Sequence, residues 1–421
     1  MEFNNTSVRV LAVNCGSSTL KFQLFELEPG DNGDGHEKRL ARGLIEEIGT
    51  RGSLSFSIEG GKSLRKAGTI ADHDQATRRM LEWLESQELL KRDGRWAVGH
   101  RVVHGGDRFT EPTRIDDQVL KAIEAVSELA PLHNDPALQA IHAAREELGP
   151  KVPMVAVFDT AFHSALPKKA SGYAIRQDLA ERHMIRRYGF HGIAHRYMTE
   201  RYCLITSRPV EQTKLITLQL GNGCSAAAVA GGRSIDTSMG FTPLEGLMMG
   251  TRSGDLDPSL PGFLARHEGI EIEEVEHWLN TGSGLLGVSG RSRDMRDLLK
   301  AAQQGDARAD LAVEMFCYRI RKYIGAYLAA LGGADAIIFG GGIGENAAEV
   351  RTRICAGMDW CGLRLDEDRN ANALGSEERI SAANSRLHAY VIPVDEGLMI
   401  ARETVRCLNG TPSLRELSRR S

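Results

Sequence analysis

The sequence predicts an α/β protein built from two related domains, and three observations lead to that prediction. A strand, a polar turn and a second strand open the chain between Val8 and Phe25. The same arrangement returns about 205 residues later, from Lys214 onward, as expected of an internal duplication. Further strand patterns alternate with amphipathic helix patterns, which is typical of sheets covered by helices.

The composition is that of an ordinary globular enzyme. The 421 residues favour two domains, and the net charge of −4 provides no basic field for nucleic acid. No apolar run reaches the roughly 18 residues of a membrane span, and the first residues lack the pattern of a signal peptide. Seven scattered cysteines without a CxxC pair indicate neither a disulfide framework nor a zinc site. We therefore expect a cytoplasmic protein without a membrane or nucleic-acid partner.

The first hairpin carries a turn that suits a phosphate. An apolar run ends at Val13, and an alternating run begins at Leu20. The turn between them offers backbone N–H groups and three hydroxyls, and Lys21 adds a cation. A plain hairpin with a polar tip is the alternative interpretation.

The next elements complete the first half of the chain. Residues 28–62 are rich in glycine and charge, so we expect surface loops with short antiparallel strands such as 53–58. Residues 75–90 have the apolar spacing of an amphipathic helix. Residues 96–106 predict a buried strand that ends in a glycine turn. Arg101 lies inside this strand, and a buried guanidinium needs a partner, either a bound anion or an internal salt bridge.

Asp159 is a candidate because of its position after a strand. Helix patterns at 116–129 and 137–148, separated by a proline-bounded break, precede a strand at 152–158. Ligands of open α/β sheets lie beyond the carboxyl ends of strands, where Asp159 follows. A carboxylate that caps the next element is the alternative.

The segment RRYGFHGIAH, residues 186–195, concentrates cations and histidines. His191 and His195 are four residues apart, as two metal ligands on a helix could be. No carboxylate or cysteine accompanies them, and Gly192 weakens a helix. We favour contact with an anion or a substrate.

Two more glycine-rich turns follow in the second half. The strand at 214–220 leads into the turn at 221–225, and strands follow at 226–229 and 234–238. A third glycine cluster, 340–346, lies between a buried strand and a helix. Bare glycines let a phosphate or a flat ligand approach the backbone, although neither a Walker motif nor a Rossmann context is present.

Arg252 and Glu396 are the last two candidates. Arg252 lies among small residues in the loop 243–258, as an unobstructed guanidinium would, although an ordinary surface arginine is the alternative. A long helix pattern covers 309–331. Near the end, the strand 391–394 leads to Asp395 and Glu396 and then to a helix that reaches Cys407.

Three of these motifs resemble signatures of the acetate kinases. They are NCGSSTLK at 14–21, YGFHG at 188–192 and GTRSG at 250–254, and the resemblance extends from residue 8 to residue 407. It implies two duplicated ribonuclease H-like domains of the actin/Hsp70/sugar-kinase type, with the nucleotide in the interdomain cleft. The domains would be 1–160 plus 397–421, and 161–396. The family activity is the reversible transfer of the ATP γ-phosphoryl group to acetate, which gives acetyl phosphate and ADP, by a magnesium-dependent homodimer.

The resemblance also implies a role for each matching residue. The catalytic residues would be Asp159, His191, Arg252 and Arg101, and Mg²⁺, or Mn²⁺, would be held by Asn14 and Glu396. Acetate would contact Arg101, Val103, Leu132, His133, Phe190 and Pro243. The phosphates would contact Ser17, Thr19, Lys21, Gln219, Leu220, Gly221, Asn222 and Gly223. The adenosine would contact Asp294, Met295, Arg296, Gly342, Ile343, Gly344, Glu345 and Asn346.

Three positions depart from the family pattern. Gln219 stands where histidine is usual, and glutamine keeps a donor but cannot become a cation. Thr19 replaces a serine and keeps the hydroxyl. Gly397 replaces an acidic residue, so the implied metal role rests on Glu396 alone.

Three alternative functions remain. A propionate or butyrate kinase would use the same site with a larger pocket. An Hsp70-like ATPase would have no obvious use for Arg101, His191 and Arg252. A sugar kinase would need an aspartate base, which Asp159 could be, but two arginines suit an anionic acceptor better.

Overall fold

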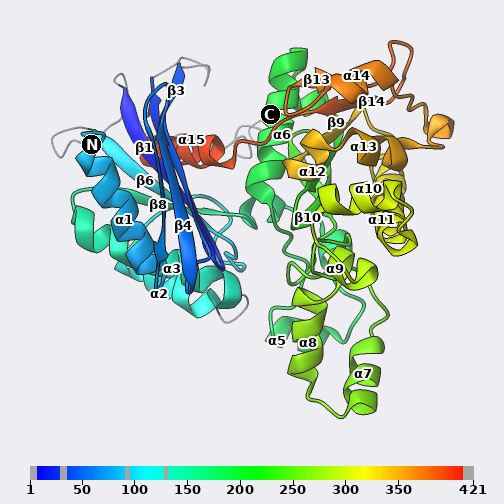
Figure 1. Ribbon diagram of the computed structural model, residues 1–421, viewed down its shortest axis with the longest axis horizontal. Helices are drawn as coiled ribbons and strands as arrows, with labels where there is room; N and C mark the ends of the chain where they lie inside the picture. The colour runs from blue at the N-terminus through cyan, green and yellow to red at the C-terminus, as the bar shows by residue number, and fades with distance from the viewer. Residues whose placement is uncertain (1–6, 29–35, 91–94, 128–130, 411–421) are drawn as a thin grey trace. The chain divides into compact units, whose positions relative to one another are not determined.

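The computed structural model describes residues 7–28, 36–90, 95–127 and 131–410, without the side chains of 131–133. The chain divides into two compact units, Met1–Ala161 with Asp395–Ser421 and Phe162–Val394 (Figure 1). This division lies within two residues of the predicted one. One correction concerns Glu396, which we assigned to the second domain. It starts helix α15 (Glu396–Asn409), which belongs to the first unit.

The first unit is a sheet with helices on both faces. Within the described residues its strands are β1 (Val8–Gly16), β2 (Thr19–Leu27), β3 (Glu37–Glu46), β4 (Arg51–Ile58), β5 (Ser63–Thr69), β6 (Trp96–Val102), β7 (Thr113–Arg114) and β8 (Met154–Phe158). Its helices are α1 (His73–Ser86), α2 (Asp117–Val126), α3 (Pro131–Leu148) and α15. The strand order is β5-β4-β3-β2-β1-β6-β8-β7.

The alternation of side chains along β1 explains the two covered faces. Leu11 and Val13 point into the larger core with α1 and α3, whereas Val8 and Val10 pack with Ala401 of α15. Successive residues of a strand point to opposite faces, so a strand buried on both sides reads as a continuous apolar run. Figure 1 shows α1 to α3 on one side of this sheet and α15 on the other.

The second unit contains a smaller sheet and more helices. Its strands are β9 (Lys214–Leu220), β10 (Cys224–Ala230), β11 (Arg233–Thr237), β12 (Ala336–Gly340), β13 (Glu378–Arg379) and β14 (His388–Val391). Its α-helices are α4 (Lys168–Ser171), α5 (Gln177–Arg182), α6 (Gly192–Thr206), α7 (Leu260–Glu268), α8 (Ile272–Thr281), α9 (Gly284–Ser289), α10 (Met295–Gln303), α11 (Ala307–Leu331), α12 (Gly341–Asn346), α13 (Ala348–Cys355) and α14 (Glu367–Asn372). Short 3₁₀ turns lie at Ala161–His163, Val210–Gln212 and Asp359–Cys361.

The two sheets share one topology. The order β3-β2-β1-β6-β8 in the first corresponds to β11-β10-β9-β12-β14 in the second. In each, an antiparallel hairpin continues into two parallel strands. The predicted α/β fold with a duplicated core is therefore confirmed. Parallel strands bring their carboxyl ends to one edge, which is where ligands of such sheets bind.

The segment 37–58 agrees with the prediction in part. The antiparallel strand expected at 53–58 is confirmed as β4, whereas the long strand β3 stands where we expected mainly surface loops. The inward side chains of these strands, including Ala41, Ile45 and Phe56, are buried. Lys38 and Arg42 are exposed side chains of β3, and these charges obscure the apolar alternation in the sequence.

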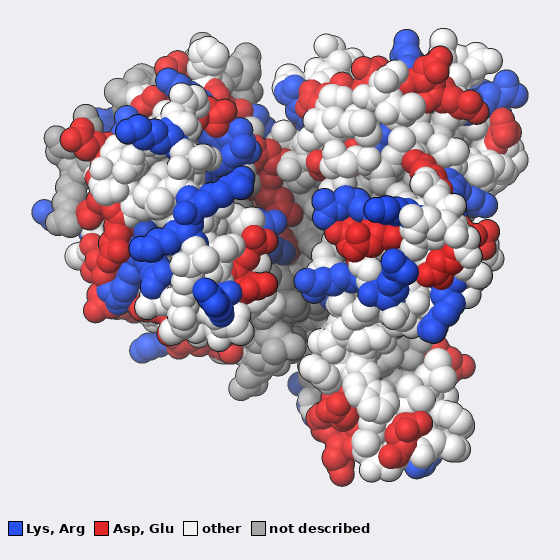
Figure 2. Space-filling view, viewed as in Figure 1, with Lys and Arg blue, Asp and Glu red and all other residues white. Residues whose placement is uncertain are grey.

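Charged side chains of both signs are distributed over the face of the protein that Figure 2 shows, where lysine and arginine are interspersed with aspartate and glutamate. Among the described residues, no helix combines the length and the apolar character required to cross a bilayer.

Candidate functional site

Arg101 is the centre of a polar cluster in the first unit. It is the sixth residue of β6, and β6 lies parallel to β1 and β8, so Arg101 is flanked by Asn14 and Asp159 at the carboxyl ends of those strands. Nε of Arg101 donates to Oδ2 of Asp159 at 3.1 Å, and Nη1 donates to Oδ1 of Asn14 at 2.9 Å. Nδ2 of Asn14 in turn donates to Oε2 of Glu396 at 2.8 Å. Four predicted residues thus form one hydrogen-bonded chain, and Arg101 has the internal salt bridge that was one of its two interpretations.

The charges in this cluster stabilise each other. Burial acts to lower the pKa of Arg101, but the carboxylates of Asp159 and Glu396 outweigh it and raise the pKa, so the guanidinium stays charged. The side chain of Asp159 is only 1% exposed, and its Oδ1 accepts no hydrogen bond within the described part of the chain. A buried carboxylate oxygen without a donor is costly unless another group satisfies it.

The donor set of this cluster fits magnesium. No group of three or more histidine, cysteine, aspartate or glutamate side chains that could hold a metal occurs among the described residues. Magnesium does not need one, because it keeps several waters and takes one or two carboxylates together with substrate phosphates. Oδ1 of Asp159 and the carboxylate of Glu396 could supply those carboxylate contacts.

The turn of the first hairpin is tight and open to solvent. Gly16 pairs with Thr19, so the turn itself is Ser17 and Ser18, and both are exposed, as is Lys21 two residues later. A Cβ at Gly16 would lie 2.8 Å from Oγ1 of Thr19, so a larger residue there would displace the Thr19 hydroxyl. Cys15 is buried, and burial raises the pKa of its thiol to about 12, which makes it unreactive.

The second hairpin brings its turn against two predicted catalytic side chains. Leu220 pairs with Cys224, so Gly221, Asn222 and Gly223 form the turn. A Cβ built on Gly223 would lie 3.4 Å from Nε2 of His191 and 3.6 Å from Nη2 of Arg252. The structure therefore brings together, within the second unit, the second predicted phosphate loop and both of these side chains.

Gln219 lies next to this turn with an unsatisfied amide oxygen. It is half-buried at the end of β9, directly opposite Ser225 of β10. Its Oε1 is buried without a hydrogen-bond partner in the described residues. An amide at this position can still offer N–H donors to a ligand.

The loop that carries Arg252 is held by the amino end of α9. The N–H groups of Ser283, Leu285 and Leu286 donate to the carbonyls of Thr251, Met249 and Gly250, at 2.9, 2.9 and 3.0 Å. The first N–H groups of a helix have no partner inside the helix, so these loop carbonyls satisfy them. Arg252 itself donates from Nη1 to the carbonyl of Pro243 at 2.7 Å.

Arg187 also holds this loop in place, a role that the sequence analysis did not predict. Nη1 of Arg187 donates to the carbonyls of Thr237, Ser238 and Met239, and its Nη2 pairs with Glu245. The hydroxyl of Tyr173 also contacts Glu245. The partners of Arg187 lie 50 or more residues away in the sequence, and a pair of adjacent arginines gives no signal of such contacts.

His191 has an unusual backbone conformation. Its φ of 56° lies in the left-handed region, at the residue that precedes α6. A non-glycine residue in that region is strained, and such strain gathers at functional sites. Nδ1 of His191 is 2.9 Å from Oγ of Ser225, so this hydrogen bond holds the orientation of the ring.

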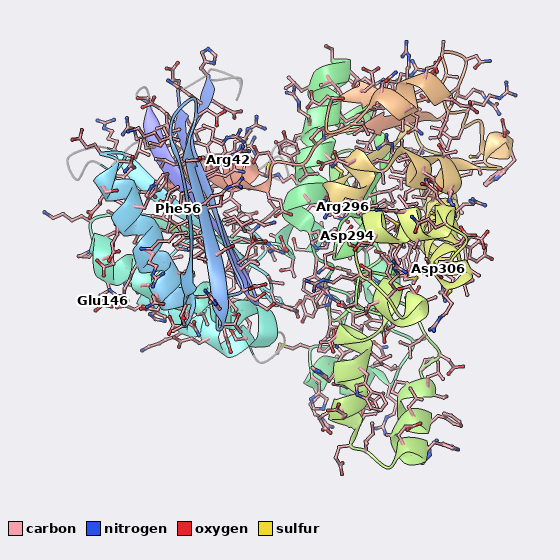
Figure 3. The ribbon with its side chains drawn as sticks, in the orientation of Figure 1. Arg42, Phe56, Glu146, Asp294, Arg296 and Asp306 are labelled. Carbon is pink, nitrogen blue, oxygen red and sulfur yellow. The ribbon has the colours of Figure 1, made fainter. Side chains whose placement is uncertain are left out.

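The predicted adenosine residues lie at the start of two helices. Asp294 caps α10 through the N–H of Arg296, and the two side chains form an ion pair, both labelled in Figure 3. Residues 342–346 form α12 together with Gly341. Oε1 of Glu345 accepts from the N–H groups of Gly341 and Val394, at 2.8 and 2.9 Å, so Glu345 shapes this turn rather than presenting a free carboxylate.

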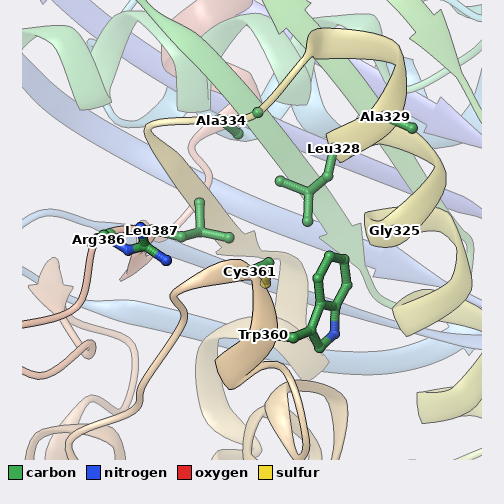
Figure 4. A pocket seen from close by; sticks show the side chains of 9 residues that line it. Gly325, Leu328, Ala329, Ala334, Trp360, Cys361, Arg386 and Leu387 are labelled. Atoms are coloured by element: carbon green, nitrogen blue, oxygen red, sulfur yellow. The ribbon is translucent and has the colours of Figure 1, made fainter.

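The residues predicted to line an acetate pocket are mostly buried. Val103 is buried in the first unit, and Phe190 and Pro243 are buried in the second. The side chains of Leu132 and His133 are not among those the structure describes, so their predicted roles stay predictions. A pocket of about 510 Å³ lies elsewhere in the second unit, beside Leu328, Trp360 and Arg386, and none of its lining residues is a candidate (Figure 4).

Comparison with known proteins gives one consistent result. A sequence model of the acetokinase family matches residues 9–402. An acetate kinase of Solibacter usitatus is 50% identical over 411 residues, which cover 96% of this chain and 99% of the relative. The crystal structure of an acetate kinase from Porphyromonas gingivalis superposes with a TM-score of 0.87 at 40% identity, covering 95% of this chain and all of that one. A propionate kinase structure from Francisella tularensis gives 0.86 at 39% identity, covering 94% and 98% of the two chains.

Proposed function

Because the chain belongs to the acetokinase family, whose members transfer phosphate to a carboxylate, we propose that it transfers the γ-phosphoryl group of ATP reversibly to acetate, giving acetyl phosphate and ADP. The resemblance predicted from the motifs is confirmed, as is the kinase class. The observation that carries the proposal is the 50% identity to an acetate kinase over nearly the whole of both chains.

The chemistry requires charge neutralisation more than a base. A carboxylic acid titrates near pH ~4, so acetate is already a nucleophile at neutral pH. The difficulty is that an anion must approach an anionic phosphoryl group. Cations aimed at the equatorial oxygens lower this barrier, because phosphoryl transfer depends chiefly on positioning and electrostatic stabilisation.

The described residues supply this chemistry in two groups. In the first unit, Arg101 would bind the acceptor carboxylate while Asp159 holds the guanidinium in place. In the second unit, His191 and Arg252, which meet at Gly223, would donate to the transferred phosphoryl group. Asp159 acts in this scheme as an orienting residue, because ionised acetate has no proton to remove.

Magnesium would be held chiefly by Asp159 and Glu396, with Asn14 fixing the Glu396 carboxylate. When bound, the ion neutralises charge on the phosphate oxygens. The turns at 17–19 and 219–223 and Lys21 would contact the polyphosphate, and Asp294–Arg296 and 342–346 would contact the adenosine. A homodimer and a cytoplasmic location are also part of the proposal, and light scattering on the purified protein tests the first.

Propionate is the second candidate acceptor, because one of the similar structures is a propionate kinase. A methylene group in an apolar pocket changes the free energy of the transition state by only about 1–3 kcal/mol. Turnover on acetate, propionate and butyrate at equal concentration therefore decides between them. The Hsp70-like ATPase is disfavoured, because acetate kinases match this chain over nearly its whole length.

The deciding experiment traps the product. Purified protein, MgATP, acetate and hydroxylamine should give acetyl hydroxamate, and omission of acetate or chelation of magnesium should abolish it. Pyrophosphate in place of ATP tests the adenosine contacts and should give no product. Hydrolysis of ATP without any hydroxamate would overturn the proposal.

A further inference from the structure

A chain of hydrogen-bonded side chains runs from His191 into the core of the second unit. Nδ1 of His191 is 2.9 Å from Oγ of Ser225. The same oxygen is 2.8 Å from Nε2 of His195, and Nδ1 of His195 is 2.7 Å from Oγ1 of Thr217. The four residues come from α6, β9 and β10, so no single stretch of sequence contains this polar chain.

The side chains behind His191 in this hydrogen-bonded series are fully buried. His195, Ser225 and Thr217 have no exposed surface. Burial lowers the pKa of His195 well below its ordinary value, and the nearby imidazoles of His163 and His191 lower it further. His195 is therefore neutral and carries one N–H, while both of its nitrogens have partners.

Two arrangements keep His191 neutral and let the Ser225 hydroxyl donate to one of the two imidazoles. In the first, Thr217 donates to Nδ1 of His195, Nε2–H of His195 donates to Ser225, and the Ser225 hydroxyl donates to Nδ1 of His191. His191 then carries its proton on Nε2. In the second, every bond is reversed, and Nε2 of His191 carries a lone pair instead of a proton.

The surroundings of Nε2 favour the first arrangement in the working enzyme. This atom faces Gly223, whose added Cβ would lie 3.4 Å from it, and the guanidinium of Arg252 approaches the same point. An anion received there is attracted by an N–H and repelled by a lone pair. The left-handed backbone of His191 costs free energy, as is common at functional sites.

We propose that Ser225 and His195 are positioning residues that hold His191 as the Nε2–H tautomer, so that the neutral imidazole donates to the transferred phosphoryl group. This inference rests on the proposed function. It adds that His191 acts without having to carry a positive charge, and that the hydroxyl of Ser225 sets its proton position. A hydroxyl that is hydrogen-bonded to one ring nitrogen of a histidine can set the tautomer, because that hydrogen bond determines whether the other nitrogen carries the proton.

Steady-state kinetics of full-length variants test the proposal. Ser225→Ala should lower kcat about 10–100-fold, less than the roughly 10²–10³-fold cost of deleting a transition-state donor outright, because the His191 ring remains. The KM for acetate and for MgATP should change less than about twofold. Ser225→Thr keeps the hydroxyl and should retain most of the activity. In a His191→Ala background, Ser225→Ala should cause no further loss, because the two residues act as one unit.

A matched control lies elsewhere in the second unit. Ser381→Ala removes another buried hydroxyl, which accepts a hydrogen bond from Nε of Arg379 at 3.1 Å. It should leave kcat within about twofold of the parent, since neither Ser381 nor Arg379 belongs to the proposed machinery. Thr217→Val tests the far end of the polar chain and should lower kcat in the same direction as Ser225→Ala.

Nitrogen-15 spectra of histidine-labelled protein give a readout that does not depend on activity. The signals that disappear in His191→Gln should show the Nε2–H tautomer in the parent and a mixture in Ser225→Ala. A parent with Nδ1–H, or an active parent whose kcat is unaffected by Ser225→Ala, overturns the inference. A parent that forms no acyl phosphate overturns the proposed function instead, so the two failures are distinguishable.

Discussion

Arg252 is a residue whose surroundings fix its direction. It lies beside Gly223 and His191 and donates to the carbonyl of Pro243, while α9 holds the flanking backbone. A guanidinium placed in advance costs no reorganisation when negative charge develops, and this is why such groups stabilise a transition state more than a ground state.

Arg252→Ala should therefore lower kcat by about 10³–10⁵, the range for a positioned arginine in phosphoryl transfer. The KM for acetate should change far less, about threefold or less, because Arg101 would bind the carboxylate. Initial-rate kinetics with both substrates varied measure the two effects. Arg266→Ala, an exposed arginine on α7, is the control. Equal losses in kcat and in acetate binding would contradict the assignment.

His100 predicts acid sensitivity. It is 1% exposed in β6, and burial lowers its pKa to about 3, against about 6.5 in an unfolded chain. The unfolded state therefore binds more protons between these values. The stabilising contribution is complete above pH ~6.5 and is lost as the pH falls toward ~3, at up to about 1.4 kcal/mol per pH unit.

Urea unfolding of His100→Gln between pH 7.5 and 4.5 checks this prediction. The free energy of unfolding should depend less steeply on pH in this variant than in the parent, by up to one proton, whatever its absolute stability. His277→Gln, at an exposed position, should keep the parental slope. An unchanged slope in His100→Gln would show that another group causes the acid sensitivity.

At the scale of elements, the sequence predicts features that depend on local patterns. It does not predict contacts between residues that are far apart in the chain. The hairpins β1–β2 and β9–β10 were predicted because strand alternation and turn residues are local signals. The contacts of Ser225 with His191 and His195 depend on the register of β9 and β10 and on how α6 packs over them. The contacts of Arg187 are likewise made with backbone carbonyls, and a pattern of side chains in the sequence does not indicate such contacts.

The contact between α9 and the loop that carries Arg252 predicts that a substitution at the start of α9 disturbs the loop. Gly284 begins α9 with a φ of 62°, and a Cβ there would lie 2.2 Å from the carbonyl oxygen of Met249 and 2.6 Å from that of Arg252. Gly284→Ala must therefore move the loop. We expect a loss of about 1–3 kcal/mol in the free energy of unfolding and a kcat lowered about 10–100-fold, because a small displacement of a catalytic group is costly.

Gly282→Ala is the matched control for this prediction. Gly282 has a φ of −117°, and its added Cβ would meet only the carbonyl of Trp278 at 3.5 Å, an ordinary contact. Thermal unfolding and kcat should both stay close to the parent. If Gly284→Ala loses stability but keeps its kcat, the α9 contact supports the fold without positioning Arg252.

At the scale of the molecule, the chain leaves its first unit after Ala161 and returns to it at Asp395. The shared sheet order shows why the sequence revealed the duplication, since each half repeats a hairpin and a strand followed by a glycine turn. The closing helix α15 was also predicted, as a helix that reaches Cys407, and the resemblance assigned it to the first domain. Its contacts with Val8 and Val10 were not predicted, because they join the two ends of the chain.

Two units with separate cores predict two unfolding transitions that can be shifted one at a time. Ala401 is fully buried on α15 in the first unit, and Ala312 is fully buried on α11 in the second. A buried, unpaired carboxylate costs about 3 kcal/mol or more, which lowers the midpoint of a unit of this size by about 6–12 °C. In differential scanning calorimetry, Ala401→Asp should lower one transition and Ala312→Asp the other. A single transition that both variants shift equally would mean that the units unfold as one, since cooperative coupling merges domain transitions.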